Sequence, residues 1–477
     1  MEEKKIVAIE IGSSKVRGAI GTYSPSGVLT VLAVEEEPTL EMVRYGAVSN
    51  LEEVASLINR IVRKIENRVS PRKVNSVYVA MGGRSFCSIP REEEAQFAEE
   101  VEITEEVLRD LIRQTAQSPH TDRELLQVVP REYIVDKKTV NRPKGTVGHT
   151  IRMAANLIVC RPQIKRNIDR LFNEKLKLNI SGYKVRQIAL GDVVLTSEEK
   201  RLGCMLVDFG AETTTVSIYK HGRLQYLATL PLGSRNITRD IMKLNHLEEK
   251  AEALKCEVGD VSPQQNRQQS SLAFVDVDYT EINNYVIARA GEIIANIHKQ
   301  LDYAGYKSED LTGGIVIVGG GSRLKGFNEA LEKKLNMKLR TGIVSLAEVR
   351  IPDSRISASG AADVIAVLYR AALDGANECL SFIEPEPIPE PEPEPIVEPQ
   401  QPIQEIQPKP EPAPAPAPAP APQPEVEVRE EPRPRKASWL DILKRKIENV
   451  MTESEDSDLM DDGYPPQKAN NKQTIIY

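Results

Sequence analysis

The chain has 477 residues, a net charge of −8 and five cysteines without any C-x-x-C spacing. This length predicts more than one domain, the acidic balance argues against general nucleic-acid binding, and the scattered cysteines and histidines argue against a protein-ligated metal site. No apolar run approaches the roughly 18 residues of a membrane span, and the N-terminal MEEKK lacks the apolar stretch of a signal peptide.

The first predicted element is a β-hairpin within residues 6–20, IVAIEIGSSKVRGAI. An apolar strand ends at Glu10, and Gly12 and two serines lead into a second strand. A tight turn of this kind exposes backbone N–H groups and hydroxyls, which suits it to holding phosphates. Gly-Ser turns are common in β proteins, so this hairpin by itself is weak evidence for a phosphate site.

Strands and helices alternate in the following part of the chain. The apolar residues of 52–67 recur at helical spacing, whereas 74–83 predicts a buried strand that runs into a glycine turn. Thr104 is placed to cap a helix over 107–116. Two further strands are predicted, at 126–136 and 151–160. This alternation predicts an α/β fold with largely buried strands.

A second hairpin repeats the form of the first. Residues 205–219, MLVDFGAETTTVSIY, again run from an apolar strand to an acid, x-Gly, hydroxyl residues and another strand. Two matching hairpins in one chain predict a duplicated nucleotide-binding domain. In such a domain Glu10 and Asp208 would face each other across one cleft.

Two later segments carry candidate ligand-binding residues. Glu252 and Lys255 lie three residues apart on one face of a helix predicted over 251–259, where a surface ion pair is the simpler interpretation. The triple glycine at 319–321 follows a buried strand and would let the backbone approach a flat ligand closely. A packing turn is the alternative, and by itself the better supported one.

The composition changes sharply after residue 383. Residues 384–434 contain 19 of the 32 prolines and predict an extended, disordered linker. Residues 438–452, SWLDILKRKIENVMT, predict an amphipathic helix. Residues 453–477 predict a disordered tail that opens with acidic residues.

The helix at 438–452 is predicted to lie on an anionic membrane surface. It begins with the only Trp of the chain, follows three basic residues and has no core of its own to pack on. Docking on the body of the protein or in a partner groove is the alternative. The predicted membrane-contacting residues are Trp439, Leu440, Ile442, Leu443, Lys444, Arg445, Ile447 and Val450.

Together, the two hairpins, the helix at 251–259 and the glycine turn resemble the phosphate-1, phosphate-2, ribose and adenosine motifs of the actin-like ATPase superfamily. The resemblance implies ATP and Mg²⁺ as ligands, with Glu10 and Asp208 holding Mg²⁺ through water molecules. The implied nucleotide-binding residues are Gly12, Ser13, Ser14, Lys15, Asp208, Gly210, Thr213, Thr214, Glu252, Lys255, Gly319, Gly320, Gly321 and Arg323.

The second hairpin departs from the superfamily pattern D-x-G-G-G-T-x-D. Ala211 and Glu212 replace two glycines, which restricts positive φ angles and puts a carboxylate where it would repel a γ-phosphate. Hydrolytic members carry a water-polarising Gln or Glu at the start of a helix near 187–195, and the alignment puts Arg186 or Gln187 there. We therefore expect ATP binding with at most weak hydrolysis, and Gln187 is the candidate catalytic residue.

Residues 84–160 resemble the subdomain that is inserted in the FtsA family of bacterial cell-division proteins. The block LLQVVPREYIVDKKTVNRPKGTVGHTIRMAANLIVC is similar to that family's V-I-P-x-E-Y-x-I-D stretch, P-x-G-x-x-G loop and closing strand. The resemblance covers roughly residues 4–375 and resumes at the C-terminal helix. It implies an actin-like duplicated α/β fold with an inserted α+β subdomain. The implied parts are subdomain 1A (1–83 and 161–200), the inserted SHS2-like subdomain 1C (84–160), subdomain 2A (201–232 and 312–380, which returns to 1A), subdomain 2B (233–311), the linker (384–434), the membrane helix (438–452) and the tail (453–477).

The resemblance implies a peripheral adaptor at the cytoplasmic face of the membrane at the division septum. Members of the family bind ATP, polymerise and tether FtsZ filaments to the membrane. The implied partners are the FtsZ C-terminal peptide, other copies of the chain, further division proteins through the inserted subdomain, and anionic lipid, without nucleic acid.

Arg289, in a helix predicted over 281–301, matches an arginine on which the FtsZ peptide docks in the family, and an ordinary solvated arginine is the alternative. The alternative functions for the chain are an actin-like scaffold of type IV pilus assembly and an ATPase of the chaperone or sugar-kinase kind. The altered second hairpin and the tail argue against the ATPase, and the linker and terminal helix, which the pilus scaffold normally lacks, argue against the scaffold.

Overall fold

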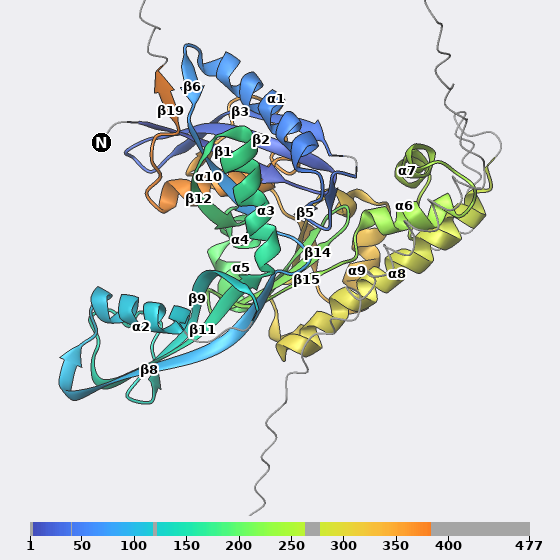
Figure 1. Cartoon of the computed structure of the whole chain (residues 1–477). Coiled ribbons are helices and arrows are strands. Elements are labelled where there is room, and N and C mark those ends of the chain that lie inside the picture. The colour runs from blue at the N-terminus through green and yellow to red at the C-terminus, as the bar shows by residue number, and fades with distance from the viewer. Residues whose placement is uncertain (1–2, 40, 118–121, 263–276, 383–477) are drawn as a thin grey trace, which may run out of the picture. The chain divides into compact units, whose positions relative to one another are not determined.

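The computed structural model describes residues 3–39, 41–117, 122–262 and 277–382. These residues form two lobes, each built on a β-sheet, and an inserted subdomain (Figure 1). The predicted linker (384–434), membrane helix (438–452) and acidic tail (453–477) lie outside the described residues.

The first lobe is built on a six-stranded sheet. Its strands, in the order in which they lie in the sheet, are β12 (Asn179–Val185), β7 (Ser76–Met81), β1 (Lys4–Ile11), β2 (Lys15–Tyr23), β3 (Leu29–Pro38) and β18 (Val349–Arg350). Its helices are α1 (Leu51–Val69), α3 (Pro162–Asp169), the π-helical segment η1 (Arg170–Leu176), α4 (Arg186–Val194) and α10 (Ala362–Leu373). Four short strands complete it: β4 (Val43–Arg44), β5 (Ala47–Val48), β6 (Arg72–Val74) and β19 (Leu380–Phe382).

Helices α1 and α10 cover opposite faces of this sheet. A side chain on Gly18 of β2 would collide with Ile61 of α1, whereas one on Gly21 of the same strand would lie against Leu368 of α10. Residues an odd number apart in a strand point to opposite faces. The C-terminal part of the described chain therefore returns to the first lobe, which places Asp363 of α10 in that lobe.

The second lobe repeats the local order of the first. Its strands are β15 (Arg223–Leu230), β14 (Thr214–Lys220), β13 (Cys204–Phe209), β16 (Ile315–Val318) and β17 (Leu339–Thr341), and its helical segments are α5 (Ser197–Leu202), α6 (Ser234–Met242), α7 (Glu248–Glu257), α8 (Tyr279–Ala304), η2 (Ser308–Asp310), η3 (Gly320–Arg323) and α9 (Phe327–Leu335). β13 pairs antiparallel with β14 and parallel with β16, as β1 pairs with β2 and β7. The predicted duplication is therefore present in the sheet topology.

The two faces of β13 belong to different hydrophobic cores. Met205, Val207 and Phe209 pack with the core beneath α8 and α9, while Cys204 and Leu206 join the core of the first lobe. This alternation is the period of a strand buried on both faces. It turns Asp208 toward the first lobe.

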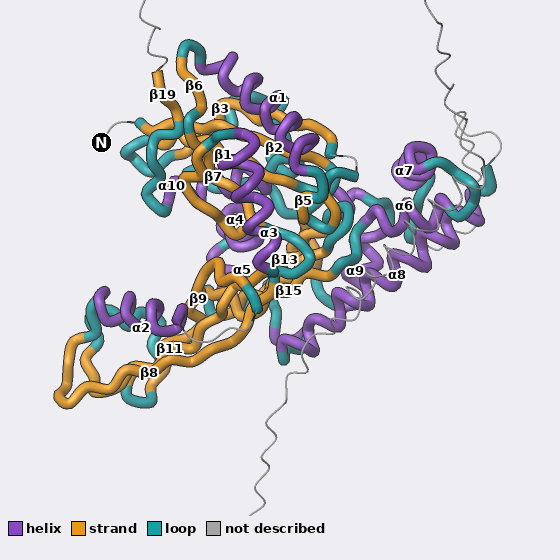
Figure 2. Tube along the Cα trace, viewed as in Figure 1, coloured by secondary structure: helices purple, strands orange, loops and turns teal. Residues whose placement is uncertain are grey.

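The inserted subdomain is a small α+β unit with its own core. Its elements are β8 (Cys87–Glu102), α2 (Glu105–Gln117), β9 (Glu124–Val135), β10 (Lys138–Thr139) and β11 (Val147–Cys160). Leu111 of α2 packs there against Tyr133 and Met153. Cys87 of β8 pairs with Ala228 of β15, so the strands of the subdomain and of the second lobe form one nine-stranded sheet (Figure 2).

Candidate functional site

The tips of the two long hairpins have the same turn geometry. In each, a glycine amide donates a 2.9 Å hydrogen bond to a carbonyl three residues later, from Gly12 to Lys15 and from Gly210 to Thr213. Ser13 and Thr213 line one small cavity between the two tips. The hairpins therefore face the same space, as the duplicated pattern predicted.

This space is nearly closed. The cavity between the tips, which Arg186 also lines, has a volume of about 30 Å³. Sites for small molecules usually measure about 300–1,000 Å³, so the lobes would have to move apart to admit a nucleotide. A larger cavity of about 260 Å³ lies beside Lys184, Arg370 and Asp374, away from the tips, and both cations there are paired with Asp374.

Glu10 and Asp208 share a buried cluster with one further acid and two arginines. Arg186 lies 2.6 Å from Asp208 Oδ2, 3.3 Å from Glu10 Oε1 and 3.7 Å from Asp363 Oδ1. Arg17 lies 3.3 Å from Glu10 Oε2 and 3.7 Å from Asp363 Oδ2. The two predicted acids do come together, with a guanidinium between them.

Burial and like charge govern the protonation of this cluster. Burial raises the pKa of Asp208 to about 6, with neighbouring Asp363 and Glu10 adding to the rise and Arg186 opposing it. The pKa of Glu10 is also raised, by burial and by Asp363. Burial acts to lower the pKa of Arg186, but the three acids outweigh it and raise that pKa. Arg186 is therefore a permanent positive charge.

The acids in this arrangement do not fit a magnesium ion. Mg²⁺ needs a near-octahedral shell of oxygens at about 2.0–2.1 Å, and the space between Glu10 and Asp208 holds the guanidinium of Arg186. Among the residues that the structure describes, no group of three or more His, Cys, Asp or Glu side chains is placed to hold a metal. The water-mediated Mg²⁺ site stays a prediction, and the contacts of Arg186 oppose it.

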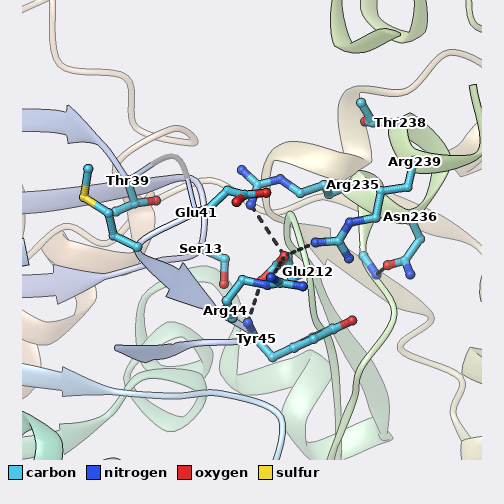
Figure 3. A network of polar contacts seen from close by, with 12 residues as sticks. Ser13, Thr39, Glu41, Arg44, Tyr45, Glu212, Arg235, Asn236, Thr238 and Arg239 are labelled. Carbon is cyan, nitrogen blue, oxygen red and sulfur yellow. Dashed lines mark hydrogen bonds and ion pairs between the residues drawn. The ribbon is translucent and has the colours of Figure 1, made fainter. Parts of the chain in front are cut away.

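Glu212 is a fully buried acid that connects the two lobes. Figure 3 shows Arg44, Tyr45, Arg235 and Arg239 converging on it. Its carboxylate lies 2.7 Å from Arg239, 3.5 Å from Arg235 and 3.9 Å from Arg44, and it accepts a 2.5 Å hydrogen bond from the Tyr45 amide. Tyr45 lies between β4 and β5 in the first lobe, whereas Arg235 and Arg239 are on α6 in the second lobe.

Sequence analysis missed these partners of Glu212. The prediction that Glu212 repels a γ-phosphate treated its carboxylate as unpaired, whereas three guanidinium groups surround it. A buried carboxylate that replaces a glycine needs cationic partners. Arg235 and Arg239, which are four residues apart on the helix after the hairpins, were the available signal.

Of the other residues predicted at the phosphates, some lie at the cavity and some do not. Ser13 lies at the cavity, where its Oγ accepts a 2.9 Å hydrogen bond from the Gly46 amide. Ser14 is exposed, and Lys15 is paired with Glu36 at 2.6 Å. The Thr214 hydroxyl donates a 2.6 Å hydrogen bond to the Leu232 carbonyl. Contacts of Ser14, Lys15 and Thr214 with phosphate stay predictions.

The predicted ribose residues Glu252 and Lys255 form an ion pair, as the simpler interpretation expected, but Lys255 is buried and not at the surface. Lys255 Nζ lies 2.7 Å from Glu252 and 3.0 Å from the Thr238 hydroxyl. Lys255 is buried, and its ammonium also donates to the Ser234 carbonyl at 3.4 Å. The pair thus fastens α7 to α6, and its contact with a ribose stays a prediction.

Packing explains two of the three glycines in the predicted adenosine turn. Gly319 has φ 91°, and a side chain there would lie 2.4 Å from the Phe209 carbonyl oxygen. A side chain on Gly321 would lie 2.6 Å from the Phe209 ring. Gly320 has room, since the nearest described atom is Arg323 Nη2 at 3.8 Å. Packing therefore leaves Gly320 unexplained.

Gln187 is buried at the start of α4, directly after Arg186. Its Nε2 donates a 3.4 Å hydrogen bond to the Thr215 hydroxyl, while its Oε1 has no partner among the described residues. A free amide oxygen is the group needed to orient a water molecule. Arg186 contacts the acids, and the catalytic role of Gln187 stays a prediction.

Arg289 lies on α8 in a local network of acids. It is 2.5 Å from Asp240 Oδ2 and also forms an ion pair with Glu292. Its side chain is 25% exposed, so it is only partly solvated. Docking of a peptide on Arg289 stays a prediction.

Two segments of the chain match models of known protein families. Residues 205–361 match the family model "Cell division protein FtsA", and residues 83–159 match "SHS2 domain inserted in FTSA". The cell division protein FtsA of Porphyromonas gingivalis is 32% identical over 354 residues, which cover 72% of each chain. The FtsA of Escherichia coli K12 is 27% identical over 364 residues, which cover 72% of this chain and 84% of that protein.

A solved structure supports the fold. The chain is similar to a structure titled "PilM-PilN type IV pilus biogenesis complex", with a TM-score of 0.55 and 16% identity over 78% of this chain and 98% of that one. At this identity the likeness concerns the fold alone. The predicted actin-like α/β fold is confirmed.

Proposed function

Since the chain belongs to the FtsA family of cell-division proteins, we propose that it is an ATP-binding assembly protein that polymerises and tethers FtsZ filaments to the cytoplasmic membrane at the septum. The proposal has two parts, a nucleotide-dependent arrangement of the lobes and attachment to anionic lipid. The inserted subdomain would contact further division proteins, and Arg289 would contact the FtsZ C-terminal peptide.

The facing hairpin tips are the observation that carries the nucleotide part. Ser13 and Thr213 line one cavity between the lobes, and turns of this kind bind phosphates. ATP between the tips would set the angle between the lobes and so favour the contacts of a filament. Slow turnover at most is expected, because Ala211 and Glu212 replace glycines of the superfamily pattern.

The composition of residues 438–452 supports the membrane part. A single short amphipathic helix binds lipid reversibly, whereas a filament presents many such helices, so weak affinities combine into firm attachment. The long linker would let the helix reach lipid while the body remains in the filament. None of the helices within the described residues is long and apolar enough to cross a membrane.

Co-sedimentation with vesicles of phosphatidylglycerol and phosphatidylethanolamine tests the tether. The full chain should sediment with the vesicles, and a chain that ends at Glu384 should stay in the supernatant. Within the full chain, Leu443→Asp on the apolar face should release the protein, and Glu448→Gln on the polar face should not. Equal sedimentation of the full and shortened chains would contradict the membrane proposal.

A further inference from the structure

Arg186 lies where the superfamily pattern would place a divalent cation. It contacts both acids that were predicted to hold the metal, at 2.6 Å from Asp208 and 3.3 Å from Glu10. These acids come from the first strands of the two hairpins, so the guanidinium joins the two halves of the duplicated fold.

The ion pairs of the cluster disfavour a metal ion while Arg186 is present. Glu10, Asp208 and Asp363 supply three carboxylates, and Arg17 and Arg186 supply two guanidinium groups. A divalent cation would have to enter a buried space beside a permanent positive charge, where screening by water is weak. It would also have to break the ion pairs that now satisfy the acids.

Arg186 also has a free donor at the cavity. The residue lines the space between the hairpin tips together with Ser13 and Thr213. Its Nε is buried and has no hydrogen-bond partner within the described residues, and it lies 3.3 Å from where a side chain on Gly82 would begin. Gly82 lines the same cavity. An unused N–H of a guanidinium is a strong donor to a phosphate oxygen.

We propose that the Arg186 guanidinium replaces the divalent metal, so that this chain binds the phosphates of a nucleotide without Mg²⁺. The proposal rests on the proposed binding of ATP. It assigns Arg186 as the cationic group that contacts the phosphates of ATP. When the lobes part to admit the nucleotide, Arg186 would stay beside Glu10 of its own lobe and donate from Nε to a phosphate. Glycine at position 82 leaves the space for this contact.

Calorimetric titration with ATP, in Mg²⁺ and in EDTA, tests the proposal on the full chain. The wild type should bind with affinities within about twofold in the two buffers. Arg186→Gln should lose about 10- to 100-fold in EDTA, because one charge-assisted hydrogen bond is lost. Mg²⁺ should restore much of that loss, because the freed acids become available to it.

Arg17→Gln is the matched control. Arg17 contacts the same Glu10 and Asp363 but does not line the cavity, so its variant should still bind ATP equally in both buffers. Mn²⁺ titration followed by electron paramagnetic resonance gives a second readout without nucleotide. Arg186→Gln should gain a Mn²⁺ site that the wild type lacks.

Each result decides between the two proposals. If the wild type binds ATP only with Mg²⁺, the role of Arg186 is wrong and ATP binding stands. If the wild type binds no ATP in either buffer, the proposed nucleotide function is itself wrong. If Arg186→Gln binds ATP equally in both buffers, another group neutralises the phosphates. Should Arg186→Gln fail to fold, the EDTA titration of the wild type still decides the main claim.

Discussion

The backbone amide of Tyr45 donates a 2.5 Å hydrogen bond to the carboxylate of Glu212, although 167 residues separate them. Tyr45 lies in the first lobe and Glu212 at the tip of the second hairpin. The acid that replaces a glycine of the superfamily pattern therefore ties the lobes together. In this arrangement the cavity between the hairpin tips is nearly closed.

Loss of the Glu212 charge should loosen this connection. We expect Glu212→Gln to lower the free energy of unfolding by about 1–3 kcal/mol, because three guanidinium groups lose a buried partner. The loss is limited because two of these groups, Arg44 and Arg239, are partly exposed to water. Glu248→Gln is the control, because Glu248 is 39% exposed and pairs with Arg235 alone among the described contacts. It should cost less than about 0.5 kcal/mol. Urea unfolding measures both, and equal stability of the two variants would contradict the connection.

Substitutions in the glycine turn at 319–321 can distinguish a packing role of the turn from a role in ligand binding. Gly319→Ala should destabilise the fold by more than about 2 kcal/mol, because of its positive φ and the clash with Phe209. Gly320→Ala should change stability by less than about 0.5 kcal/mol, because its surroundings leave room. If the turn holds adenosine, Gly320→Ala should nevertheless weaken ATP binding. Unchanged ATP affinity in Gly320→Ala would reduce the turn to a packing element.

Arg289 should matter for the FtsZ C-terminal peptide because its guanidinium is already oriented by Asp240 and Glu292. Arg289→Gln removes the charge without adding a third acid to this network, and we expect peptide affinity to fall about tenfold or more. Glu292→Gln is the matched control. It removes a competing carboxylate and should leave affinity equal or higher. Fluorescence anisotropy of a labelled peptide measures both, and an unchanged affinity of Arg289→Gln removes this residue from the site.

The Asp240–Arg289 pair also predicts a dependence of stability on acid. Burial acts to raise the pKa of Asp240, but hydrogen bonds from Arg289 and Lys243 outweigh it and hold this pKa below its ordinary value of 3.8. An acid with a lowered pKa stabilises the fold fully above its unfolded pKa and loses that effect as the pH falls through the folded one. The stability difference between wild type and Asp240→Asn should therefore be constant from neutral pH to about pH 5 and should shrink below about pH 4. A difference that is constant down to pH 3 would contradict the shift.

Much of the fold could be predicted because its signals are local. The apolar spacing of 52–67 and the cap at Thr104 predicted helices, and these are α1 (Leu51–Val69) and α2 (Glu105–Gln117). The repeated acid-x-Gly turn predicted two hairpins of the same form, and both have the same glycine hydrogen bond. Strand pairing within a hairpin and helix periodicity depend on neighbours in the chain, so the sequence expresses them directly.

The candidate site was predicted only in part. Glu10, Asp208, Ser13 and Thr213 were expected to share one cleft. Glu10, Ser13 and Thr213 line one cavity, and Asp208 contacts Arg186, which also lines it. Lys15 was expected at the phosphates; it is paired with Glu36, and its contact with a phosphate stays a prediction. A long side chain can reach more than one partner, and which partner it takes depends on the strand beside it.

The sequence alone determined which turns, strands and helices this chain forms and that its nucleotide motif is altered at Glu212. Only the tertiary structure decided which residues the charged groups of Glu212 and Arg186 contact. Arg186 meets Glu10, Asp208 and Asp363 because two strands, β1 and β13, end where two helices, α4 and α10, begin, although these elements are distant in the chain. Buried charges take whatever partner the docked lobes bring within reach, and no local spacing records that partner.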